Sequence, residues 1–282
     1  MSLSIGIVGA GTMGTGIARV AALNKFNVAL YDINDTVILN GIARITSEMK
    51  RSVEKQKLSQ EEMTSTLSHI HARTKLSDLG HCDIIIEAVL EDLRIKKDLF
   101  RHLEADIKPD TVLATNTSSL SITAIASGVK RPERVVGLHF FNPVHVMKLV
   151  EVVQGAQTSE ETMHRAVDFG EKLGKACVRA KDTPGFIVNR IARPFYGEAL
   201  RIFGEGIASV EDVDRIVKGE GGFTMGPFEL MDMIGIDVNL AVTQSVYEQF
   251  FNDPRYRPHP IQRQMVDSGK LGKKSGKGFY NY

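Results

Sequence analysis

Short apolar runs alternate with stretches of helical spacing through the first two thirds of the chain. Each apolar run is rich in β-branched residues and is followed by glycine or small polar residues, which is typical of buried strands. We predict strands at residues 3–8, 28–31, 70–74, 83–89, 112–115, 135–140, 149–153 and 176–178. Helical spacing predicts helices at 13–23, at 34–68 with a break near 57–58, and at 93–107. Strands separated by helices indicate an α/β fold with a parallel, doubly wound sheet.

Helix-terminal signals support these boundaries. Ser59 and Glu62 have the spacing of a capping box, and they predict that the helical stretch at 34–68 is a pair of helices. This pair is an insertion into the strand–helix alternation. Ser121 and Ser159 are expected N-caps of two further helices.

The pattern changes near residue 185, after the segment KDTPGF. From there to the last few residues the chain shows helical spacing without a strand pattern, and Pro194 predicts a kink or restart within a long helix at 186–203. Further helices are expected to begin near Ser209, Pro227, Asp237 and Pro260. We therefore predict two domains, 1–184 and 185–282, the second all-helical. The basic, glycine-rich tail LGKKSGKGFYNY is either a loose terminus or a segment packed back on the site.

A glycine motif follows the first predicted strand. Gly9, Gly11 and Gly14 have the spacing G-x-G-x-x-G between a strand and a helix, and Asp32 ends the next strand 18 residues after Gly14. This context favours a Rossmann-type dinucleotide site over a merely structural glycine turn. We expect the segment GAGTMG, including Thr12 and Met13, to bind the pyrophosphate. An acid at the ribose position favours NAD over NADP.

Polar residues occupy several other predicted strand ends. Ligands of doubly wound sheets bind at the carboxyl ends of the strands, so the coincidence predicts a site there. The residues concerned are Asp32, Glu91, Asn116, Ser118, His139 and Asn142, together with Glu151 inside the apolar run LVEVV.

Hydride transfer from an alcohol needs a base and a donor that holds the nascent carbonyl oxygen. His139 is the best candidate for the base, and Glu151 is the candidate partner that fixes its tautomer. Ser118 and Asn189 are candidates for the hydrogen bonds to the substrate oxygen. The alternatives are a structural histidine at a strand end and a serine that caps a turn.

Other chemistries fit the sequence less well. There is no G-x-S-x-G motif, and no tyrosine is followed four residues later by lysine. His69 and His71 alternate without ligand spacing, so no metal site is predicted. The basic residues Lys50, Arg51 and their neighbours Lys55 and Lys57 are either a solvated helix face or an edge that binds the phosphates of a large anionic ligand.

Composition adds limits. A hydrophobic content of 43% and a formal net charge of +1 are those of a globular protein with no electrostatic reason to bind nucleic acid or membranes. No apolar run is long enough to span a membrane, and no signal-type segment precedes the first strand. A cytoplasmic protein is therefore expected, with Cys82 and Cys177 buried and reduced.

Several segments together resemble one known family. GAGTMGTGIA, ATNTSSLSI, GLHFFNPVHVMKLVEVV, KDTPGFIVNR, MGPFELMDMIGID and LGKKSGKGFYNY are similar to the 3-hydroxyacyl-CoA dehydrogenase family, above all to its short bacterial 3-hydroxybutyryl-CoA dehydrogenases. The resemblance covers essentially the whole chain. It implies an NAD-binding domain, a helical domain that forms a homodimer, and reversible oxidation of an (S)-3-hydroxyacyl-CoA to the 3-ketoacyl-CoA.

The resemblance also implies roles for individual residues. His139 matches the base and Glu151 its carboxylate, while Ser118 and Asn189 match groups around the substrate oxygen. Lys50 and Arg51 become expected contacts of the CoA phosphates, and the active site is expected between the two domains. The positions that match residues lining cofactor and substrate are Asp32, Glu91, Lys96, Asn116, Asn142 and Lys274.

Two rival interpretations remain at this point. One is a dehydrogenase of a free hydroxy acid such as gulonate, on the same scaffold without CoA. The other is a non-catalytic NAD-binding protein, against which the joint presence of His139, Glu151, Ser118 and Asn189 argues.

Overall fold

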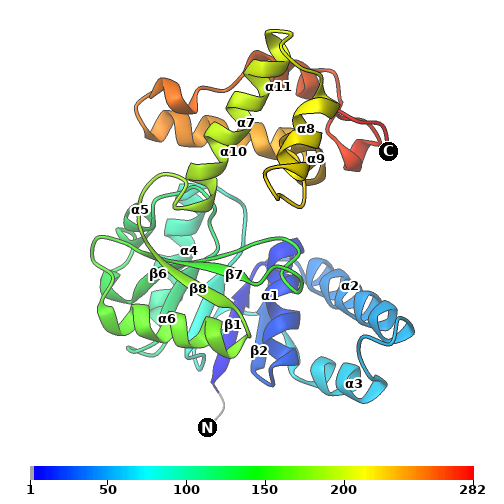
Figure 1. The fold of residues 1–282 in the computed structure, drawn as a ribbon. Helices are drawn as coiled ribbons and strands as arrows, with labels where there is room; N and C mark the ends of the chain where they lie inside the picture. Colours follow the sequence, from blue (N-terminus) through cyan, green and yellow to red (C-terminus); the bar gives the residue numbers. More distant parts are fainter. Residues whose placement is uncertain (1–2) are drawn as a thin grey trace. The chain divides into compact units, whose positions relative to one another are not determined.

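The computed structural model describes residues 3–282 and divides the chain into two compact units (Figure 1). The first unit ends at Thr183 and the second begins at Pro184. Each unit has a hydrophobic core of its own.

An eight-stranded sheet organises the first unit. Its strand order is β3-β2-β1-β4-β5-β6-β7-β8, so the chain crosses over beside β1, as in a doubly wound fold. The strands are β1 (Ser4–Val8), β2 (Asn27–Tyr31), β3 (Ile70–Arg73), β4 (Ile84–Glu87), β5 (Val112–Thr115), β6 (Val135–Phe140), β7 (Leu149–Gln154) and β8 (Ala176–Lys181). All eight predicted strands are therefore present, and the predicted α/β class is confirmed.

One strand pair departs from the predicted parallel sheet. β6 and β7 are antiparallel, while β7 and β8 are parallel to each other. The reason lies in the connections. A parallel neighbour needs a crossover of about a dozen residues or more, and the loop at 141–148 is shorter and contains no helix. The connection from β7 to β8 contains a helix, so that pair is parallel.

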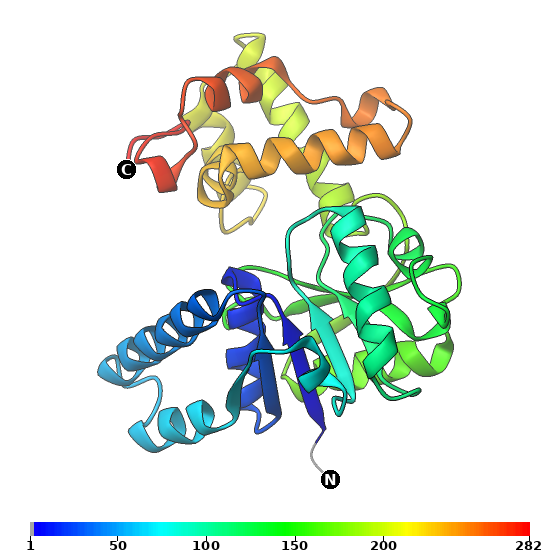
Figure 2. The same ribbon diagram turned by 180° about the vertical axis from the view of Figure 1, so that it is seen from behind.

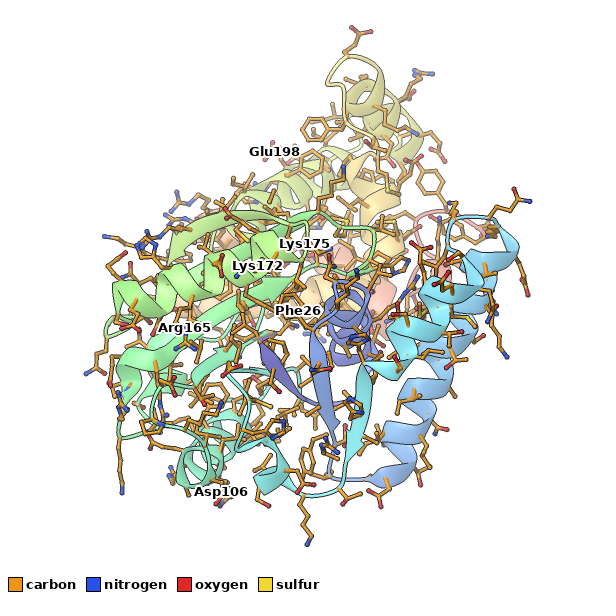
Figure 3. All side chains as sticks on the ribbon, turned by 90° about the horizontal axis from the view of Figure 1, so that it is seen from below. Phe26, Asp106, Arg165, Lys172, Lys175 and Glu198 are labelled. Atoms are coloured by element: carbon orange, nitrogen blue, oxygen red, sulfur yellow. The ribbon has the colours of Figure 1, made fainter. Side chains whose placement is uncertain are left out.

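Helices cover both faces of the sheet. Figures 1 and 2 show α1 and α6 over one face and α4 over the other. On the first face Phe26, labelled in Figure 3, packs edge-on against Phe169 of α6, with 5.4 Å between ring centroids. The helices of this unit are α1 (Thr12–Leu23), α2 (Asp35–Glu54), α3 (Gln60–Ser68), α4 (Leu93–Asp106), α5 (Ile122–Ala126) and α6 (Glu160–Lys172), with short 3-10 turns at Leu76–Leu79 and Pro132–Arg134.

The predicted helix caps are confirmed. Ser59 and Glu62 form the capping box that opens α3, so the stretch after Asn34 is indeed two helices. Ser121 and Ser159 cap α5 and α6. Figure 1 shows α2 and α3 side by side next to α1, outside the regular alternation.

Central strands of the sheet are buried on both faces. Ile5, Ile7, Ile86 and Leu113 have no exposed surface, which explains why their runs read as continuously apolar instead of alternating. Cys82 is buried and Cys177 is half-buried, and both are free thiols. In the described part of the chain no helix is long and apolar enough to span a membrane.

The second unit is a bundle of helices. They are α7 (Val188–Gly204), α8 (Val210–Gly219), α9 (Pro227–Ile234), α10 (Ile236–Gln249) and α11 (Pro260–Asp267), with 3-10 turns at Pro254–Tyr256 and Lys273–Ser275. Pro194 lies inside α7 without ending it. Leu200, Phe228, Met231 and Ile236 form the centre of its core, with no exposed surface.

Two buried carboxylates attach the C-terminal tail to this unit. Asp232 accepts hydrogen bonds from the backbone N–H groups of Phe279 (3.0 Å) and Tyr280 (2.9 Å) and from the Tyr282 hydroxyl (3.1 Å). Asp214 accepts a hydrogen bond from the Tyr280 hydroxyl at 2.9 Å. The tail is therefore packed on the helical unit and is not a loose terminus, while its predicted position on the site stays a prediction.

We expect Asp232→Asn to lower the free energy of unfolding by about 2 kcal/mol, since the new amide N–H₂ would face donors that need an acceptor. Urea denaturation measures this loss. The matched control is Asp267→Asn at the exposed end of α11, which should change stability by no more than about 0.5 kcal/mol. Equal stability of the two variants would contradict the role assigned to Asp232.

Candidate active site

In the turn after β1 the backbone requires two of the three motif glycines, Gly9 and Gly14, but not the third, Gly11. Gly9 has a φ of +104° and Gly14 lies so close to the Gly9 carbonyl that a Cβ would be 1.8 Å from its oxygen, so both need glycine. A Cβ on Gly11 would meet nothing within 4 Å. The open space at Gly11, at an α1 N-terminus that no side chain caps, fits the approach of a pyrophosphate.

Asp32 is fixed beside this turn. It follows the last residue of β2, and its Oδ2 accepts a hydrogen bond from the Ala10 backbone N–H at 2.8 Å. The carboxylate is only half-buried, so it faces both the turn and solvent. This position fits a ribose hydroxyl of a dinucleotide lying across the edge of the sheet.

A buried ion-pair network lies under the ends of β4 and β5. The Lys96 ammonium is 2.6 Å from Glu87 Oε1 and 3.2 Å from Glu91 Oε2, and the side chains of Lys96 and Glu87 are 1% and 0% exposed. Glu87 also accepts hydrogen bonds from the Val89 N–H (2.7 Å) and the Thr115 hydroxyl (2.7 Å). Charges buried this deeply are stable only when paired and hydrogen-bonded, as these are.

Glu91 extends this network to the segment that contains Ser118. Its Oε1 accepts hydrogen bonds from the Thr117 hydroxyl at 2.6 Å and the Ser118 N–H at 2.9 Å. Burial acts to raise the pKa of Glu91, but the Lys96 charge and these hydrogen bonds outweigh it and lower the pKa, so the carboxylate is ionised. Glu91 and Lys96, which were predicted to line the cofactor, thus hold the Ser118 segment in place: Glu91 bonds the segment, and Lys96 pairs with Glu91.

His139 and Glu151 face each other across the antiparallel strand pair. They are register partners in β6 and β7, so their side chains emerge on the same face of the sheet. His139 Nδ1 is 2.7 Å from Glu151 Oε2, and the two residues are 5% and 1% exposed. With Nδ1–H donating to the carboxylate, the lone pair of the imidazole is at Nε2. The Phe141 ring packs against the imidazole at 4.4 Å between centroids.

Asn116 joins the two strand ends that carry Ser118 and His139. It follows β5, and its Oδ1 accepts a hydrogen bond from the Phe140 N–H in β6 at 2.9 Å. The loop after β6, with the exposed Asn142, is held in turn by Lys175, which is labelled in Figure 3. The Lys175 ammonium donates hydrogen bonds to the carbonyls of Val144 and Met147. Asp32, Glu91, Asn116 and His139 therefore lie along one edge of the sheet.

The remaining predicted site residues lie elsewhere. Lys50 and Arg51 are exposed near the C-terminal end of α2. Asn189 and Lys274 belong to the second unit, where Asn189 is in the first turn of α7. Lys274 forms an ion pair with Asp237 at 2.6 Å. Among the described residues no group of three or more His, Cys, Asp or Glu side chains has the arrangement of a metal site.

Sequence reasoning missed Glu87. The signal was present, since Glu87 is a single carboxylate inside the apolar run DIIIEAV, as Glu151 is inside LVEVV. A buried carboxylate needs a partner, and the same argument that singled out Glu151 would have led from Glu87 to Lys96.

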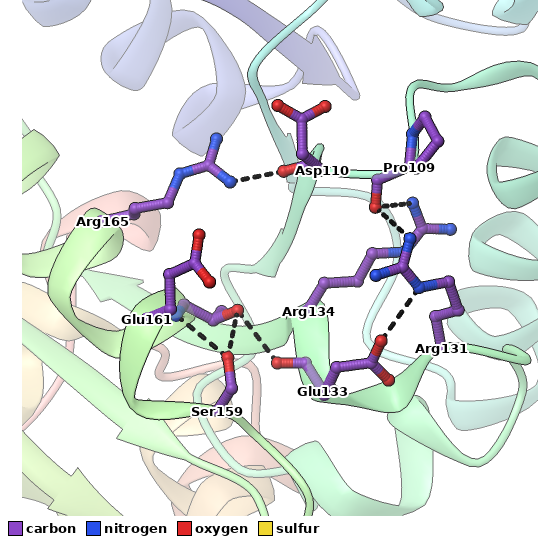
Figure 4. A pocket seen from close by; sticks show the side chains of 9 residues that line it. Pro109, Asp110, Arg131, Glu133, Arg134, Ser159, Glu161 and Arg165 are labelled. Atoms are coloured by element: carbon purple, nitrogen blue, oxygen red, sulfur yellow. Dashed lines mark hydrogen bonds and ion pairs between the residues drawn. The ribbon is translucent and has the colours of Figure 1, made fainter.

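A separate cavity of about 180 Å³ lies at the opposite edge of the sheet (Figure 4). It is lined by residues that precede β5 and β6 and by the N-terminal part of α6, and so it lies away from the carboxyl ends of the strands described above. Three arginines that line the cavity donate hydrogen bonds to backbone carbonyls of the segment before β5. They are Arg131 to Pro109 O at 2.6 Å, Arg134 to Lys108 O at 3.0 Å, and Arg165 to Asp110 O. These contacts stabilise the segment that precedes β5, and they give no reason to assign a catalytic or binding function to the cavity.

We expect Lys96→Met to destabilise the protein by about 3–5 kcal/mol, because it leaves Glu87 buried without a counter-charge. The double variant Glu87→Gln/Lys96→Met should recover about half of that loss or more, since it removes the uncompensated charge. Urea denaturation of the two variants and the parent measures both values. A double variant less stable than Lys96→Met alone would contradict the ion-pair description.

Comparison with known proteins assigns the chain to a family. Residues 4–183 match the model of the 3-hydroxyacyl-CoA dehydrogenase NAD-binding domain, and residues 185–282 match that of the C-terminal domain. A 3-hydroxyadipyl-CoA dehydrogenase of Escherichia coli is 46% identical over 279 residues, which are 99% of this chain but 59% of that protein. A 3-hydroxybutyryl-CoA dehydrogenase of Bradyrhizobium diazoefficiens is 42% identical over 99% of this chain and 94% of its own.

Solved structures agree. A crystal structure of an (S)-3-hydroxybutyryl-CoA dehydrogenase from Ralstonia eutropha matches with a TM-score of 0.95 and 41% identity, covering 100% of this chain and 99% of that one. The glycine turn and Asp32 described above lie within the part that matches the NAD-binding domain. The chain therefore belongs to the 3-hydroxyacyl-CoA dehydrogenase family of oxidoreductases, with NAD as its cofactor.

Proposed function

We propose that this protein interconverts an (S)-3-hydroxyacyl-CoA and the corresponding 3-ketoacyl-CoA. The observation that carries the proposal is the buried His139–Glu151 pair on the same sheet as a dinucleotide turn. The names of the relatives favour short acyl chains, with 3-hydroxybutanoyl-CoA and acetoacetyl-CoA as the pair to be tried first. 3-Hydroxyadipyl-CoA is a second substrate to test, because of the Escherichia coli relative.

In the proposed mechanism the chain binds, orients and deprotonates the alcohol. NAD would be held by the Gly9–Gly14 turn and Asp32 and would supply the hydride acceptor. His139 Nε2 takes the proton of the 3-hydroxyl as the hydride leaves C3. Glu151 keeps the Nδ1–H tautomer and stabilises the imidazolium that forms, which is the role of a preorganised counter-charge in a buried site.

Two further groups are proposed to hold the reacting oxygen. Ser118 sits in the segment that Glu91 fixes through the Thr117 hydroxyl and the Ser118 N–H. Asn189 lies in the first turn of α7 in the second unit.

Recognition of CoA is proposed to involve the basic end of α2. Lys50, Arg51, Lys55 and Lys57 are exposed, and none of them makes an ion pair within the described residues, so their charges are available to phosphates. The helix itself is attached to α1, because Arg19 bonds Glu48 at 3.1 Å and Ser52 at 3.3 Å. A dehydrogenase of a free hydroxy acid would not need this basic end, because its substrate carries no CoA phosphates.

A homodimer through the second unit is also part of the proposal. Several large apolar side chains of this unit are exposed, which is typical of an interaction surface. They include Ile191, Ile207, Ile216, Phe223 and Val238.

We expect His139→Gln to lower kcat by about 100- to 10,000-fold, because glutamine cannot accept the proton. The affinity for NADH should stay within twofold, since the substitution leaves the glycine turn intact. The measurement is NADH absorbance with acetoacetyl-CoA, combined with NADH fluorescence titration. Glu151→Gln should lose less than His139→Gln but still be severe. Near-normal turnover of His139→Gln would remove His139 as the base, and an inactive parent would favour a non-catalytic NAD-binding protein.

We expect Lys50→Ala/Arg51→Ala to raise the KM for acetoacetyl-CoA about tenfold, because two charge contacts of about 0.7 kcal/mol each are lost. The KM for NADH should not change, and the effect should shrink at high salt. The matched control is Lys172→Ala, an exposed lysine on α6. A protein that oxidises free hydroxy acids such as gulonate, with no effect of the double variant, would support the rival function.

A further inference from the structure

The second unit buries an arginine that has no acidic partner. Arg193 in α7 is 5% exposed, and no carboxylate of the described residues forms an ion pair with it. Its Nη1 donates to the Asn239 carbonyl and the Thr243 hydroxyl, both at 2.9 Å, and its guanidinium lies 5.0 Å from the Tyr196 ring centroid. Burial lowers the pKa of Arg193 to about 10, so the group is charged at neutral pH.

A charge in such surroundings is costly, and an apolar side chain of similar volume would avoid the cost. A purely structural link between α7 and α10 would not need a guanidinium, because the neutral groups of Asn239 and Thr243 can be satisfied by other neutral groups. The contacts of Arg193 within its own helix indicate what the charge does.

The hydrogen bonds among those contacts are with Asn189, one helical turn earlier. Arg193 Nη2 is 3.4 Å from Asn189 Oδ1, and Arg193 Nε is 3.3 Å from the Asn189 carbonyl. A guanidinium carries only donors, so only the oxygen of the asparagine amide can face it. With Oδ1 on the guanidinium, the N–H₂ group of the amide is directed away from Arg193. The flipped amide would place its N–H₂ group against a buried positive charge.

We propose that Arg193 is a positioning residue that fixes the orientation of the Asn189 amide, so that this amide presents its N–H donors to the 3-oxygen of the substrate. The inference rests on the proposed function, in which Asn189 holds that oxygen. The donor must be in place before negative charge develops on the oxygen, because a preorganised donor costs no reorientation in the transition state. Without the Arg193 charge, the flipped amide is no longer disfavoured by that charge, and its oxygen would repel the negative charge that develops on the substrate oxygen.

The kinetic test is a double-mutant cycle with acetoacetyl-CoA and NADH. We expect Arg193→Met to lower kcat about tenfold with the KM for NADH unchanged, and Asn189→Ala to lower it by at least as much. Adding Arg193→Met to Asn189→Ala should cost less than a further twofold, because the residue through which Arg193 acts is gone. A kcat of Arg193→Met within twofold of the parent, or the same loss in both backgrounds, would overturn the proposal.

Two controls separate positioning from packing. Thr243→Val removes an acceptor of Arg193 without touching Asn189, and Arg190→Met removes another α7 arginine, which bonds the Tyr256 hydroxyl at 3.3 Å. Both variants should keep kcat within twofold of the parent. A tenfold loss in Thr243→Val would assign Arg193 a structural role and overturn the proposal.

A second test measures melting temperatures, and it depends neither on enzymatic activity nor on the Arg193→Met variant. Asn189→Asp keeps an acceptor on the guanidinium, whereas Asn189→Ala leaves the guanidinium without that acceptor. We expect Asn189→Asp to melt at the same temperature as Asn189→Ala or higher. A lower melting temperature of Asn189→Asp would mean that the side chain at position 189 does not lie on the guanidinium, and would overturn the proposal. An inactive parent with the expected melting order would contradict the proposed function while supporting the contact.

Discussion

The hydrogen bond between His139 and Glu151 is the interaction on which the rest of the first unit depends. A carboxylate at 1% exposure requires a donor within reach, and the imidazole at 2.7 Å provides it. The pair exists because β6 and β7 are antiparallel and in register at these two residues. A shift of one residue would send one of the two side chains to the other face of the sheet. The register between β6 and β7 therefore also sets the position of the proposed base relative to its carboxylate.

Buried charge lies next to a proposed site residue at three of the places described above, and each time it orients a neighbouring group or segment. Glu151 orients an imidazole, and the Glu87–Lys96–Glu91 network orients the backbone that carries Ser118. Arg193 faces the amide of Asn189 in the second unit. The desolvation cost of such groups is several kcal/mol each, which an ordinary fold avoids. At these three places the buried charge is consistent with rigid placement of donors and acceptors for chemistry, whereas the buried Asp214 and Asp232 hold the C-terminal tail.

Much of the fold followed from local pattern. The apolar runs gave all eight strands, because central parallel strands are buried on both faces, and Ser59, Ser121 and Ser159 marked helix starts through their capping hydroxyls. The antiparallel β7 was missed, although the short loop after β6 allowed no crossover. Candidate site residues at strand ends do lie on one edge of the sheet, but nothing in the spacing of Glu87 and Lys96 identified them as a pair.

The sequence by itself determined the order of strands and helices, the dinucleotide turn with Asp32, the change to an all-helical part near residue 185, and which side chains are chemically able to act as base, donor or charge partner. These depend on periodicity and on short spacings, which neighbours along the chain fix. Only the tertiary structure decided which of those side chains meet: His139 with Glu151, Lys96 with Glu87 and Glu91, and the tail with Asp232. Except for Lys96 and its two carboxylates, which are close in sequence, these contacts join residues distant along the chain. Strand register, burial and the hydrogen-bonding needs of charges removed from water select them, and none of these can be read from a single segment.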